Sequence, residues 1–429
     1  MTITHGPAGS TRLLAGWLRT GRPASLAEHL DSYGAVPPLR PLGRARSIIE
    51  TVADAGLAGR GGAWFPTATK MRAVAHGRGP AVMVVNAVES EPASDKDRLL
   101  MSVAPHLVLD GAALAGHAVG AEEIILAVRA DLAAAVQAAV GERAGSGNWA
   151  PFRVEACPDG YVSSEETALI HHLNSGPAVP TFTPPRPFQR GVRGRPTLVQ
   201  NAETLAHLAL LVRYGARWFR SVGTSDAPGT TLVTIGGAVH RPGVYEVELG
   251  ATLGDVLRRA GGARETLQAV LTGGYFGGWV PAPVLHDTPL TPEGMRRAGG
   301  LLGTGALLAL PERSCGLAET ARLATWLGTQ SSGQCGSCFL GLPAIAADLT
   351  AIAGGGTPGH AKRLRDRLIV VTGRGACHHP DGVVRLVASA LSTFAADTEL
   401  HTTRGPCAGT HNRPLAPLPS TRPLQSARR

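Results

Sequence analysis

The sequence has few cysteines, almost no lysine and no long apolar run. Six cysteines in 429 residues are too few for a disulfide scaffold, so the chain suits a reducing compartment and we expect it in the cytoplasm. Lysine occurs only at Lys70, Lys96 and Lys362, so we expect each lysine to have a specific structural or functional role. Because no 18-residue apolar stretch and no signal-peptide pattern occur, we expect neither a membrane span nor a secreted protein.

The positive charge is concentrated near the C-terminus. The net charge is +9, and residues 402–429 contain five arginines, no acidic residue and no aromatic residue. This composition, which is also rich in proline, predicts a disordered basic tail. The rest of the chain is only mildly basic and shows no basic groove with interleaved aromatic residues, so we do not expect nucleic-acid binding.

Sequence patterns divide the remaining chain into four parts. Residues 1–45 are predicted to form a short helical lead-in. Residues 46–228 alternate buried strands with helices, which is typical of an α/β layer with a largely parallel sheet. Residues 229–310 carry a β-hairpin, a helix and a glycine-rich turn, the pattern of a small β-grasp domain. Residues 311–401 are predicted to form a helical bundle around most of the cysteines.

A glycine-rich loop, Leu57–Thr67, leads into a predicted helix. Glycines let backbone N–H groups approach a phosphate closely, and the start of a helix adds a favourable dipole. In a chain with 55 glycines, such a loop is more often only a turn. Lys70, three positions after Thr67, strengthens the interpretation as a phosphate site.

Two polar segments accompany this loop. Asn86–Arg98 directly follows the predicted strand Ala81–Asn86, and open α/β sheets bind ligands at the carboxyl ends of their strands. Taken alone, this segment favours the interpretation as a charged cap on the next helix. In the second segment, Glu165 and Glu166 lie together at the start of a helix, where Ser163 and Glu166 would also form a capping box.

Taken in order, these segments resemble the NADH-binding flavoprotein subunit of respiratory complex I, which is shared with NAD-reducing hydrogenases and NAD-dependent formate dehydrogenases. Its pattern G-R-G-G-A-G-F-P-T-G-x-K is matched by Gly59–Lys70, and N-x-D-E-x-E-P…K-D-R by Asn86–Arg98. Its pattern Y-x-C-G-E-E-T-A-L is matched by Tyr161–Leu169, and P-T-x-x-N-N-x-E-T-L by Pro196–Leu205. The resemblance covers residues 25–400. It implies an FMN-binding α/β domain, a β-grasp domain of the SLBB (ubiquitin-like) type, and a C-terminal helical bundle with an iron–sulfur site.

The resemblance also implies an activity and its cofactors. Hydride would pass from NAD(H) or NADP(H) to FMN, and an iron–sulfur cluster would then pass single electrons to a ferredoxin-like protein or another subunit. Phe65 would be an aromatic platform for the nicotinamide nucleotide, with Lys70, Glu91 and Glu166 as polar contacts. The implied cofactor-binding residues are Gly59, Arg60, Gly61, Gly62, Ala63, Phe65, Lys70, Asn86, Glu89, Glu91, Tyr161, Ser164, Glu165, Glu166, Gln200 and Asn201.

Several residues depart from the family pattern near the flavin. Trp64 replaces a glycine, Val88 replaces an aspartate, and Ser164 replaces a glycine. Trp64 would either fill the nicotinamide slot or offer a new stacking face. Arg193 stands where the family usually has a second nucleotide-stacking aromatic residue, and its charge could favour the phosphorylated ribose of NADPH. These changes support a rival hypothesis, a catalytically degenerate scaffold or ligand-binding subunit; a β-grasp ligand-binding module alone explains only residues 229–310.

The predicted cluster site has a serine in its first ligand position. Two successive x₂ spacings followed by a remote cysteine form the ligand pattern of a four-iron, four-sulfur (4Fe-4S) cluster. The predicted metal ligands are Ser332, Cys335, Cys338 and Cys377. A serine oxygen, water, His378 or His379 would complete the set, and a three-iron cluster, a Cys₃His zinc site or metal-free buried cysteines are the alternatives. The other cysteines, which show no ligand pattern and are interpreted as structural, are Cys157, Cys315 and Cys407.

Overall fold

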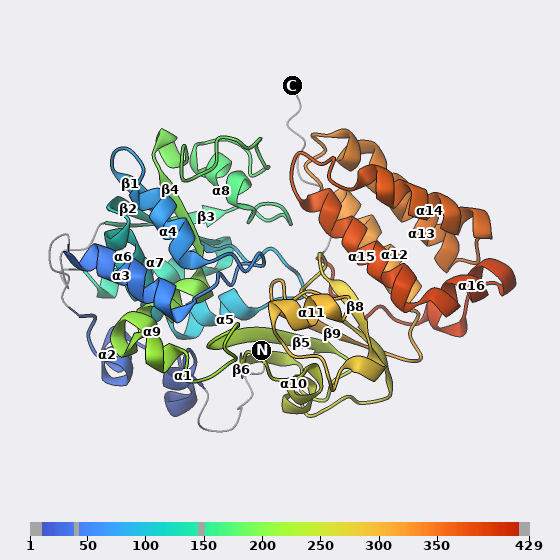
Figure 1. The fold of residues 1–429 in the computed structure, drawn as a ribbon, viewed down its shortest axis with the longest axis horizontal. Helices are drawn as coiled ribbons and strands as arrows, with labels where there is room; N and C mark the ends of the chain where they lie inside the picture. Colours follow the sequence, from blue (N-terminus) through green and yellow to red (C-terminus); the bar gives the residue numbers. More distant parts are fainter. Residues whose placement is uncertain (1–10, 38–42, 145–150, 420–429) are drawn as a thin grey trace.

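The computed structural model describes residues 11–37, 43–144 and 151–419, which form three units in chain order (Figure 1). An α/β unit lies on the left of the view, a β-grasp unit lies below it towards the centre, and a helical bundle lies on the right. The lead-in contains α1 (Ala15–Thr20) and α2 (Leu26–Tyr33), followed by α3 (Gly43–Ala55). The backbone N–H groups of Arg12 and Leu13 donate to the Glu246 carboxylate at 3.0 and 2.9 Å, which joins the lead-in to the β-grasp unit.

A four-stranded parallel sheet forms the centre of the α/β unit. Its strands are β1 (Ala81–Ala87), β2 (Ala121–Arg129), β3 (Phe152–Cys157) and β4 (Thr197–Asn201), in the order β3-β2-β1-β4. All neighbouring pairs are parallel, which confirms the predicted α/β layer. The helices of this unit are α4 (Thr67–Ala75), α5 (Lys96–Val103), α6 (Pro105–Ala118), α7 (Ala133–Glu142), α8 (Glu166–Leu173) and α9 (Ala202–Phe219). Because Asn86 pairs in register with Asn201, the predicted polar segments meet at one edge of the sheet.

The second unit has the predicted β-grasp architecture. Its strands are β5 (Thr230–Gly237), β6 (Gly243–Glu248), β7 (Leu267–Thr272), β8 (Gly278–Pro281) and β9 (Ala306–Pro311), in the order β6-β5-β9-β7-β8. Only β5 and β9 are parallel. Two short helices, α10 (Leu253–Arg259) and α11 (Pro292–Arg297), complete the unit. A capping box between Thr252 and Asp255 starts α10.

The third unit is the predicted helical bundle, drawn in orange and red in Figure 1. Its α-helices are α12 (Gly316–Thr329), α13 (Leu342–Ala353), α14 (Pro358–Val371), α15 (His379–Thr393) and α16 (Ala395–Arg404). A π-helical turn, Ser337–Gly341, leads directly into α13 and contains Cys338. π-Helical turns are often found at functional sites. Within the described part of the chain, no single helix is long and apolar enough to cross a membrane; α5 and α6 pass such a test only together, and they meet at 97°.

The prediction of a disordered tail is wrong for residues 402–419. Helix α16 continues to Arg404, and Ala416 is only 4% exposed. Arg322 donates to the carbonyl of Ala416 at 2.6 Å, and Tyr275 donates to the carbonyl of Pro417. Side chains elsewhere in the fold therefore satisfy the backbone of this segment, and composition cannot reveal such contacts. Residues 420–429 lie outside the described residues.

Candidate functional site

Asn86 and Asn201 connect three of the four motifs at the carboxyl edge of the sheet. The Asn86 amide donates to the carbonyl of Ser164 at 2.8 Å. The Asn201 amide donates to Asp97 at 2.7 Å and contacts the Asn86 carbonyl at 3.5 Å. Asn201 also caps α9 by accepting the N–H of Glu203 at 3.0 Å. The edge predicted from the sequence is therefore a preformed polar surface, as expected at the ligand-binding edge of an open α/β sheet.

The glycine-rich loop lies directly against this edge. The N–H of Gly59 donates to the carbonyl of Phe65 at 2.8 Å and closes the loop. A Cβ atom at Gly61 would lie only 3.3 Å from the Asn201 Cβ, so the close approach favours glycine. The Thr67 hydroxyl, in the first turn of α4, is buried and has no hydrogen-bond partner. A tight cradle with a spare buried donor fits a phosphate-bearing group such as FMN.

The residues expected to contact the nicotinamide nucleotide include an exposed aromatic ring and an ion pair. Phe65 is 53% exposed. The Lys70 ammonium pairs with the Glu166 carboxylate between α4 and α8, and both side chains are partly exposed. The predicted capping box is wrong, because Glu165 caps α8 by accepting the N–H groups of Thr167 and Ala168. This arrangement leaves Glu166 for the pair with Lys70.

Arg60 and Trp64 serve the contact between units. The Arg60 guanidinium is 2% exposed and donates to the carbonyls of Ala58 and Thr230 at 2.8 and 3.2 Å. Burial lowers its pKa to about 10. The ring of Trp64 stacks on this guanidinium at 4.4 Å, and its indole N–H donates to the carbonyl of Gly303 at 2.9 Å. Trp64 is therefore a stacking face for an arginine of the same chain, and its ring is directed to the β-grasp unit.

Glu89 caps a helix. Its carboxylate accepts the N–H groups of Asp97 and Arg98 at 3.0 Å, near the start of α5, together with the Ser94 hydroxyl. Burial raises the pKa of Glu89 to about 7, and the neighbouring Asp97 acts in the same direction. The contacts of Glu89 thus supply the local reason for the acidic residue in this motif.

Lys96 lies in a buried network of ion pairs, which gives a local reason for one of the three lysines. Its ammonium is 2.8 Å from Asp97 and 3.0 Å from Glu203, and it donates to Asn201 at 3.3 Å. Burial opposes the charge, but the carboxylates of Asp97 and Glu203 outweigh it and raise the pKa of Lys96. Glu203 also accepts the N–H of Leu232 at 2.8 Å, so the network reaches the β-grasp unit.

Glu91 and Tyr161 lie where the three units meet. The Glu91 carboxylate accepts the Tyr161 hydroxyl at 2.9 Å and the N–H of Tyr275 at 2.8 Å. Burial raises the pKa of Glu91 to about 7, although these hydrogen bonds act to lower it. The Tyr161 ring packs edge-on against Phe276 at 4.7 Å and Trp326 at 5.4 Å. Glu91 is thus enclosed by the junction.

Three residues that depart from the family pattern make ordinary contacts. Val88 is 7% exposed and packs in the apolar cluster on one face of the sheet, so no acidic group lies at this position. The Ser164 hydroxyl pairs with the Ser90 hydroxyl. Arg193 pairs with Glu123. Glu123 lies opposite Val82 in the sheet, and Val82 is four residues before Asn86, which is a distance of about 13 Å along the strand. Arg153 pairs with the same carboxylate at 3.2 Å, so the Arg193 guanidinium is held at Glu123 and away from Asn86.

The cysteines of the predicted cluster gather beside the π-helical turn. Burial acts to raise the pKa of the Cys335 thiol, but the neighbouring backbone N–H groups of Ala376, Cys338 and Ser337 outweigh burial and lower the pKa. Burial raises the pKa of Cys338 to about 12, and the nearby Cys335 contributes. Backbone N–H groups directed at sulfur stabilise thiolates and suit an iron–sulfur site.

Cys377 completes the group of three thiols. Burial raises the pKa of Cys377, whereas the backbone N–H of His379 donates to its sulfur and acts to lower it. The hydroxyl that interacts with Cys338 belongs to Ser331, the neighbour of the predicted ligand Ser332. Ser331 is the first residue of the matched motif, but the sequence did not predict it as a ligand.

The two histidines considered as further ligands differ sharply. His378 is fully exposed and lies 3.7 Å from the Asp381 carboxylate. His379 is 3% exposed, and its Nε2 lies 2.9 Å from the carbonyl of Leu327, to which it donates. Its Nδ1 is buried without a partner. Burial lowers the pKa of His379 to about 4, so the ring is neutral at pH 7.

Four exposed apolar side chains lie next to the cluster cysteines. This apolar patch consists of Phe339, Leu340, Ile369 and Val370, which are 55–75% exposed. The two pairs adjoin, because the π-helical turn packs on the end of α14, where a Cβ atom at Gly341 would lie 2.7 Å from the Val371 side chain. Grouped exposed apolar residues often mark a protein interface. Sequence reasoning missed this patch, although two large apolar residues directly follow Cys338.

Comparisons with known proteins agree with this geometry. Residues 52–210 match the family described as the Nuo51 FMN-binding domain, residues 232–274 match the SLBB domain, and residues 318–401 match the NADH-ubiquinone oxidoreductase-F iron-sulfur binding region. The NADH-quinone oxidoreductase F subunit of Mycobacterium tuberculosis is 34% identical over 84% of this chain and 85% of its own length. Its counterpart in Streptomyces coelicolor is 33% identical over 87% of this chain and 86% of its own length.

A solved structure shows the same architecture. An NAD⁺-reducing [NiFe]-hydrogenase in the H₂-reduced state matches 94% of this chain and 67% of its own chain, with a TM-score of 0.82 and 31% identity. The predicted family and the predicted order of the three units are thereby confirmed. The chain belongs to the family of NADH-quinone oxidoreductase F subunits, NADH-binding FMN and iron–sulfur proteins that transfer electrons.

Proposed function

We propose that this chain binds FMN at the carboxyl edge of its parallel sheet, oxidises NADH there, and passes single electrons to a protein partner at the apolar patch. The observation that carries the proposal is the in-register pair of Asn86 and Asn201 beneath the glycine-rich loop. When bound, FMN supplies the chemistry that converts a two-electron hydride transfer into single-electron steps. The residues of the chain contribute binding, orientation and exclusion of water.

The flavin-binding residues act through shape and hydrogen bonds. Glycine at positions 59 and 61 lets the loop backbone lie close to the sheet edge, where its N–H groups would contact the phosphate and ribityl chain, and the buried Thr67 hydroxyl has no hydrogen-bond partner. Asn86 and Asn201 hold their amides through fixed contacts, so they orient a ligand without reorganisation. Ser164, although larger than glycine, is held by Ser90.

The nicotinamide nucleotide would approach from the exposed Phe65 ring. Both side chains of the Lys70–Glu166 pair are partly open to solvent, so the pair could separate when the nucleotide binds. Lys70 would then contact a phosphate and Glu166 a ribose hydroxyl. We propose NADH as the substrate and not NADPH. The Arg193 guanidinium is held at Glu123, away from Asn86, and is therefore not placed to bind a 2′-phosphate there.

The spacing of the cluster thiols supports a cluster over a single zinc ion. Among the described residues, the three ligand atoms that all lie within 4.8 Å of one another belong to Cys315, His401 and Cys407. The three cluster thiols are therefore more widely spaced than that group. Thiolates on the corners of a cubane are farther apart than the ligands of one ion. We therefore propose a 4Fe-4S cluster on Cys335, Cys338 and Cys377, with the oxygen of Ser332 at the fourth iron.

The partner would bind at the apolar patch through both shape and charge. Arg363 and Arg367 pair with one buried carboxylate, Asp348, at 3.0 and 2.8 Å, so this group carries a net positive charge close to Ile369. An apolar centre with a basic margin suits an acidic ferredoxin-like protein or an acidic face of another subunit. All six cysteines are free, and we propose a reducing, cytoplasmic setting.

Anaerobic purification of the full chain tests the proposal. We expect about one flavin per chain, iron with acid-labile sulfide, and bleaching of the flavin absorbance by NADH but not by equimolar NADPH. A matched variant, Asn201→Leu, should lose flavin while it keeps iron. A colourless, iron-free chain that cannot be reconstituted with FMN, iron and sulfide would contradict the proposal and favour the degenerate scaffold.

A further inference from the structure

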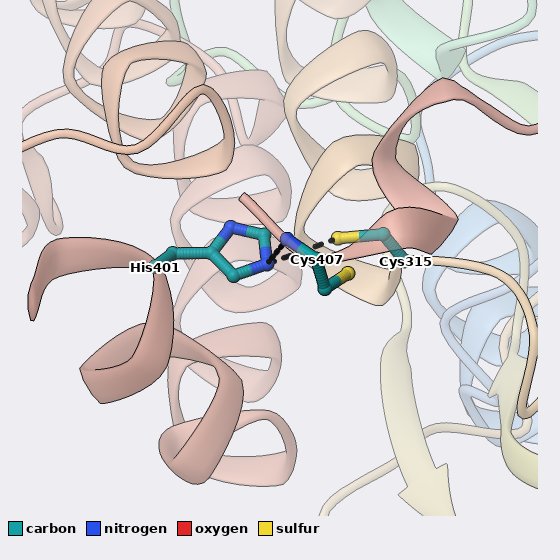
Figure 2. Close-up of side chains that lie close together, drawn as sticks. All are labelled: Cys315, His401 and Cys407. Carbon is teal, nitrogen blue, oxygen red and sulfur yellow. Dashed lines mark hydrogen bonds between the residues drawn. The ribbon is translucent and has the colours of Figure 1, made fainter. Parts of the chain in front are cut away.

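Three residues that are distant in sequence meet inside the helical bundle. Cys315 precedes α12, His401 lies on α16, and Cys407 lies in the segment after α16. The two sulfur atoms and a ring nitrogen of His401 all lie within 4.8 Å of one another (Figure 2). Cys315 is 2% exposed and His401 is completely buried. None of the three belongs to the predicted cluster site.

The orientation of His401 is fixed by its surroundings. Its Nδ1 lies 3.3 Å from the carbonyl of Ile352, which can only accept, so Nδ1 carries the proton. The lone pair on Nε2 consequently faces the two cysteines. Nε2 lies 3.9 Å from the Cys315 sulfur and accepts the backbone N–H of Cys407 at 3.1 Å, as the dashed lines in Figure 2 show. Histidines that bind metals are usually held in this way by a carbonyl behind the ring.

We propose that Cys315, His401 and Cys407 bind one zinc ion. Two thiolates and one imidazole form a donor set that Zn²⁺ prefers, with Zn–S and Zn–N distances of about 2.3 and 2.0 Å. In a tetrahedron, these bond lengths place neighbouring donor atoms about 3.5–3.8 Å apart. The sulfur and nitrogen atoms therefore need to close by at most about 1.3 Å from their present spread of up to 4.8 Å.

The coordination step balances in charge and in protons. Each thiol loses its proton to solvent as its Zn–S bond forms, and two thiolates neutralise the ion in a buried position. The Nε2 lone pair, which accepts the Cys407 N–H in the metal-free chain, would bind the metal instead. One hydrogen bond is thereby replaced by two Zn–S bonds and one Zn–N bond. Water completes the tetrahedron near the Thr410 hydroxyl, which is 3.7 Å from the Cys407 sulfur.

A cavity lies close to the proposed site. The cavity, of ≈ 540 Å³, is lined by Thr410 together with Trp326 and Gly354 of the bundle. Thr410, whose hydroxyl lies 3.7 Å from the Cys407 sulfur, stands between this cavity and the proposed site. A bound zinc ion would fasten the segment after α16 to the start of α12, in the region where the sequence predicted disorder.

Metal analysis of the full chain tests this site. The starting protein carries Cys335→Ser and Cys338→Ser, which prevents zinc from occupying the cluster thiols. After removal of metal with a chelator, one equivalent of Zn²⁺ or Co²⁺ is added anaerobically. We expect about one ion per chain and, with Co²⁺, thiolate-to-cobalt charge-transfer absorption. Cys407→Ser should weaken binding at least about 10-fold, whereas the control Cys157→Ser, a buried thiol outside the site, should not.

The same experiments define what would overturn the proposal. Equal zinc content and equal cobalt spectra in the Cys407→Ser and Cys157→Ser proteins would overturn it, as would a Cys315–Cys407 disulfide in anaerobically purified protein. If circular dichroism shows that Cys407→Ser does not fold, thiol alkylation of the protein that retains Cys315 and Cys407 tests the proposal instead. Added zinc should protect Cys315 and Cys407 together, and failure to protect either thiol would overturn the proposal.

Discussion

The hydroxyl of Tyr161 donates to the buried carboxylate of Glu91 at 2.9 Å, and this pair within the α/β unit lies where the other two units pack on it. The same carboxylate accepts the N–H of Tyr275 from the β-grasp unit at 2.8 Å. A Cβ atom at Gly274 would lie 2.4 Å from the Glu91 Oε2, so the close approach requires glycine there. Since the Tyr161 ring packs in the core of the bundle, a single side-chain pair couples the flavin and cluster ends of the molecule.

Tyr161→Phe should weaken the junction by removing only the hydroxyl. We expect a loss of about 1–2 kcal/mol in the free energy of unfolding, because a buried carboxylate loses a hydrogen bond. Tyr275→Phe is the matched control, since Tyr275 reaches Glu91 through its backbone N–H and its hydroxyl donates to Pro417. Urea unfolding at pH 6 and pH 8 measures both. Only the loss in Tyr161→Phe should grow at pH 8, and equal growth in the control would contradict the assignment.

Glu91→Gln should change how stability depends on pH. Burial raises the pKa of Glu91 to about 7 from an ordinary value of about 4.3. The folded chain therefore favours the protonated carboxyl, and this contribution to stability is complete below about pH 4.3 and is lost as pH rises through about 7. Relative to Glu91→Gln, the unchanged chain should lose at most about 3 kcal/mol between pH 4.5 and pH 8. Parallel thermal unfolding curves across this range would refute the prediction.

Trp64→Gly restores the residue that the family pattern has at this position. Glycine relieves the left-handed backbone at Trp64 (φ 54°) but removes the stacking on Arg60 and the hydrogen bond to Gly303. Because the ring is directed to the β-grasp unit, we expect the KM for NADH to change less than about 3-fold while the melting temperature falls. The melting temperature of Trp64→Phe, which keeps a stacking ring, should fall less. A large decrease in KM for Trp64→Gly would show that the indole obstructs the nicotinamide.

A series at position 332 identifies the fourth ligand of the cluster. Ser332→Cys should raise iron and sulfide content and slow cluster loss in air, because a thiolate binds iron at a far lower pH than an alkoxide does. Ser332→Ala separates the alternatives: loss of the cluster supports the serine oxygen, whereas unchanged content supports water or His379. Iron, sulfide and electron paramagnetic resonance spectra supply the measurement. No change across all three residues would argue against a cluster at this site.

Replacing the apolar patch should impair electron delivery and leave NADH oxidation intact. Phe339→Ser with Leu340→Ser removes the pair next to Cys338, and Ile369→Ser tests the adjoining helix. We expect KM for an acidic ferredoxin to rise at least about 10-fold, since exposed apolar anchors dominate such interfaces. The rate with ferricyanide, a small acceptor, should stay within about 2-fold. Val284→Ser, an exposed apolar residue of the β-grasp unit, is the matched control.

The order of the motifs and their periodicity determined the fold and the place of the site. Alternating buried strands and helices predicted the parallel sheet, and in such a sheet polar residues after successive strands must share one edge. Asn86 and Asn201 meet there because β1 and β4 are neighbouring parallel strands and the two asparagines pair in register. Helices α12 to α15 of the bundle were equally predictable from apolar residues at helical spacing, whereas α16 was not predicted as a separate helix.

Tertiary structure alone decided which of the predicted site residues face a ligand. Arg60 lies in the matching motif, yet its guanidinium is buried between two units, and Glu89 caps a helix. Cys315, His401 and Cys407 meet only because α16 and the following segment return to the start of α12. Sequence spacing specifies contacts within one loop or helix, whereas contacts between units depend on how their surfaces pack, and no local pattern records that packing.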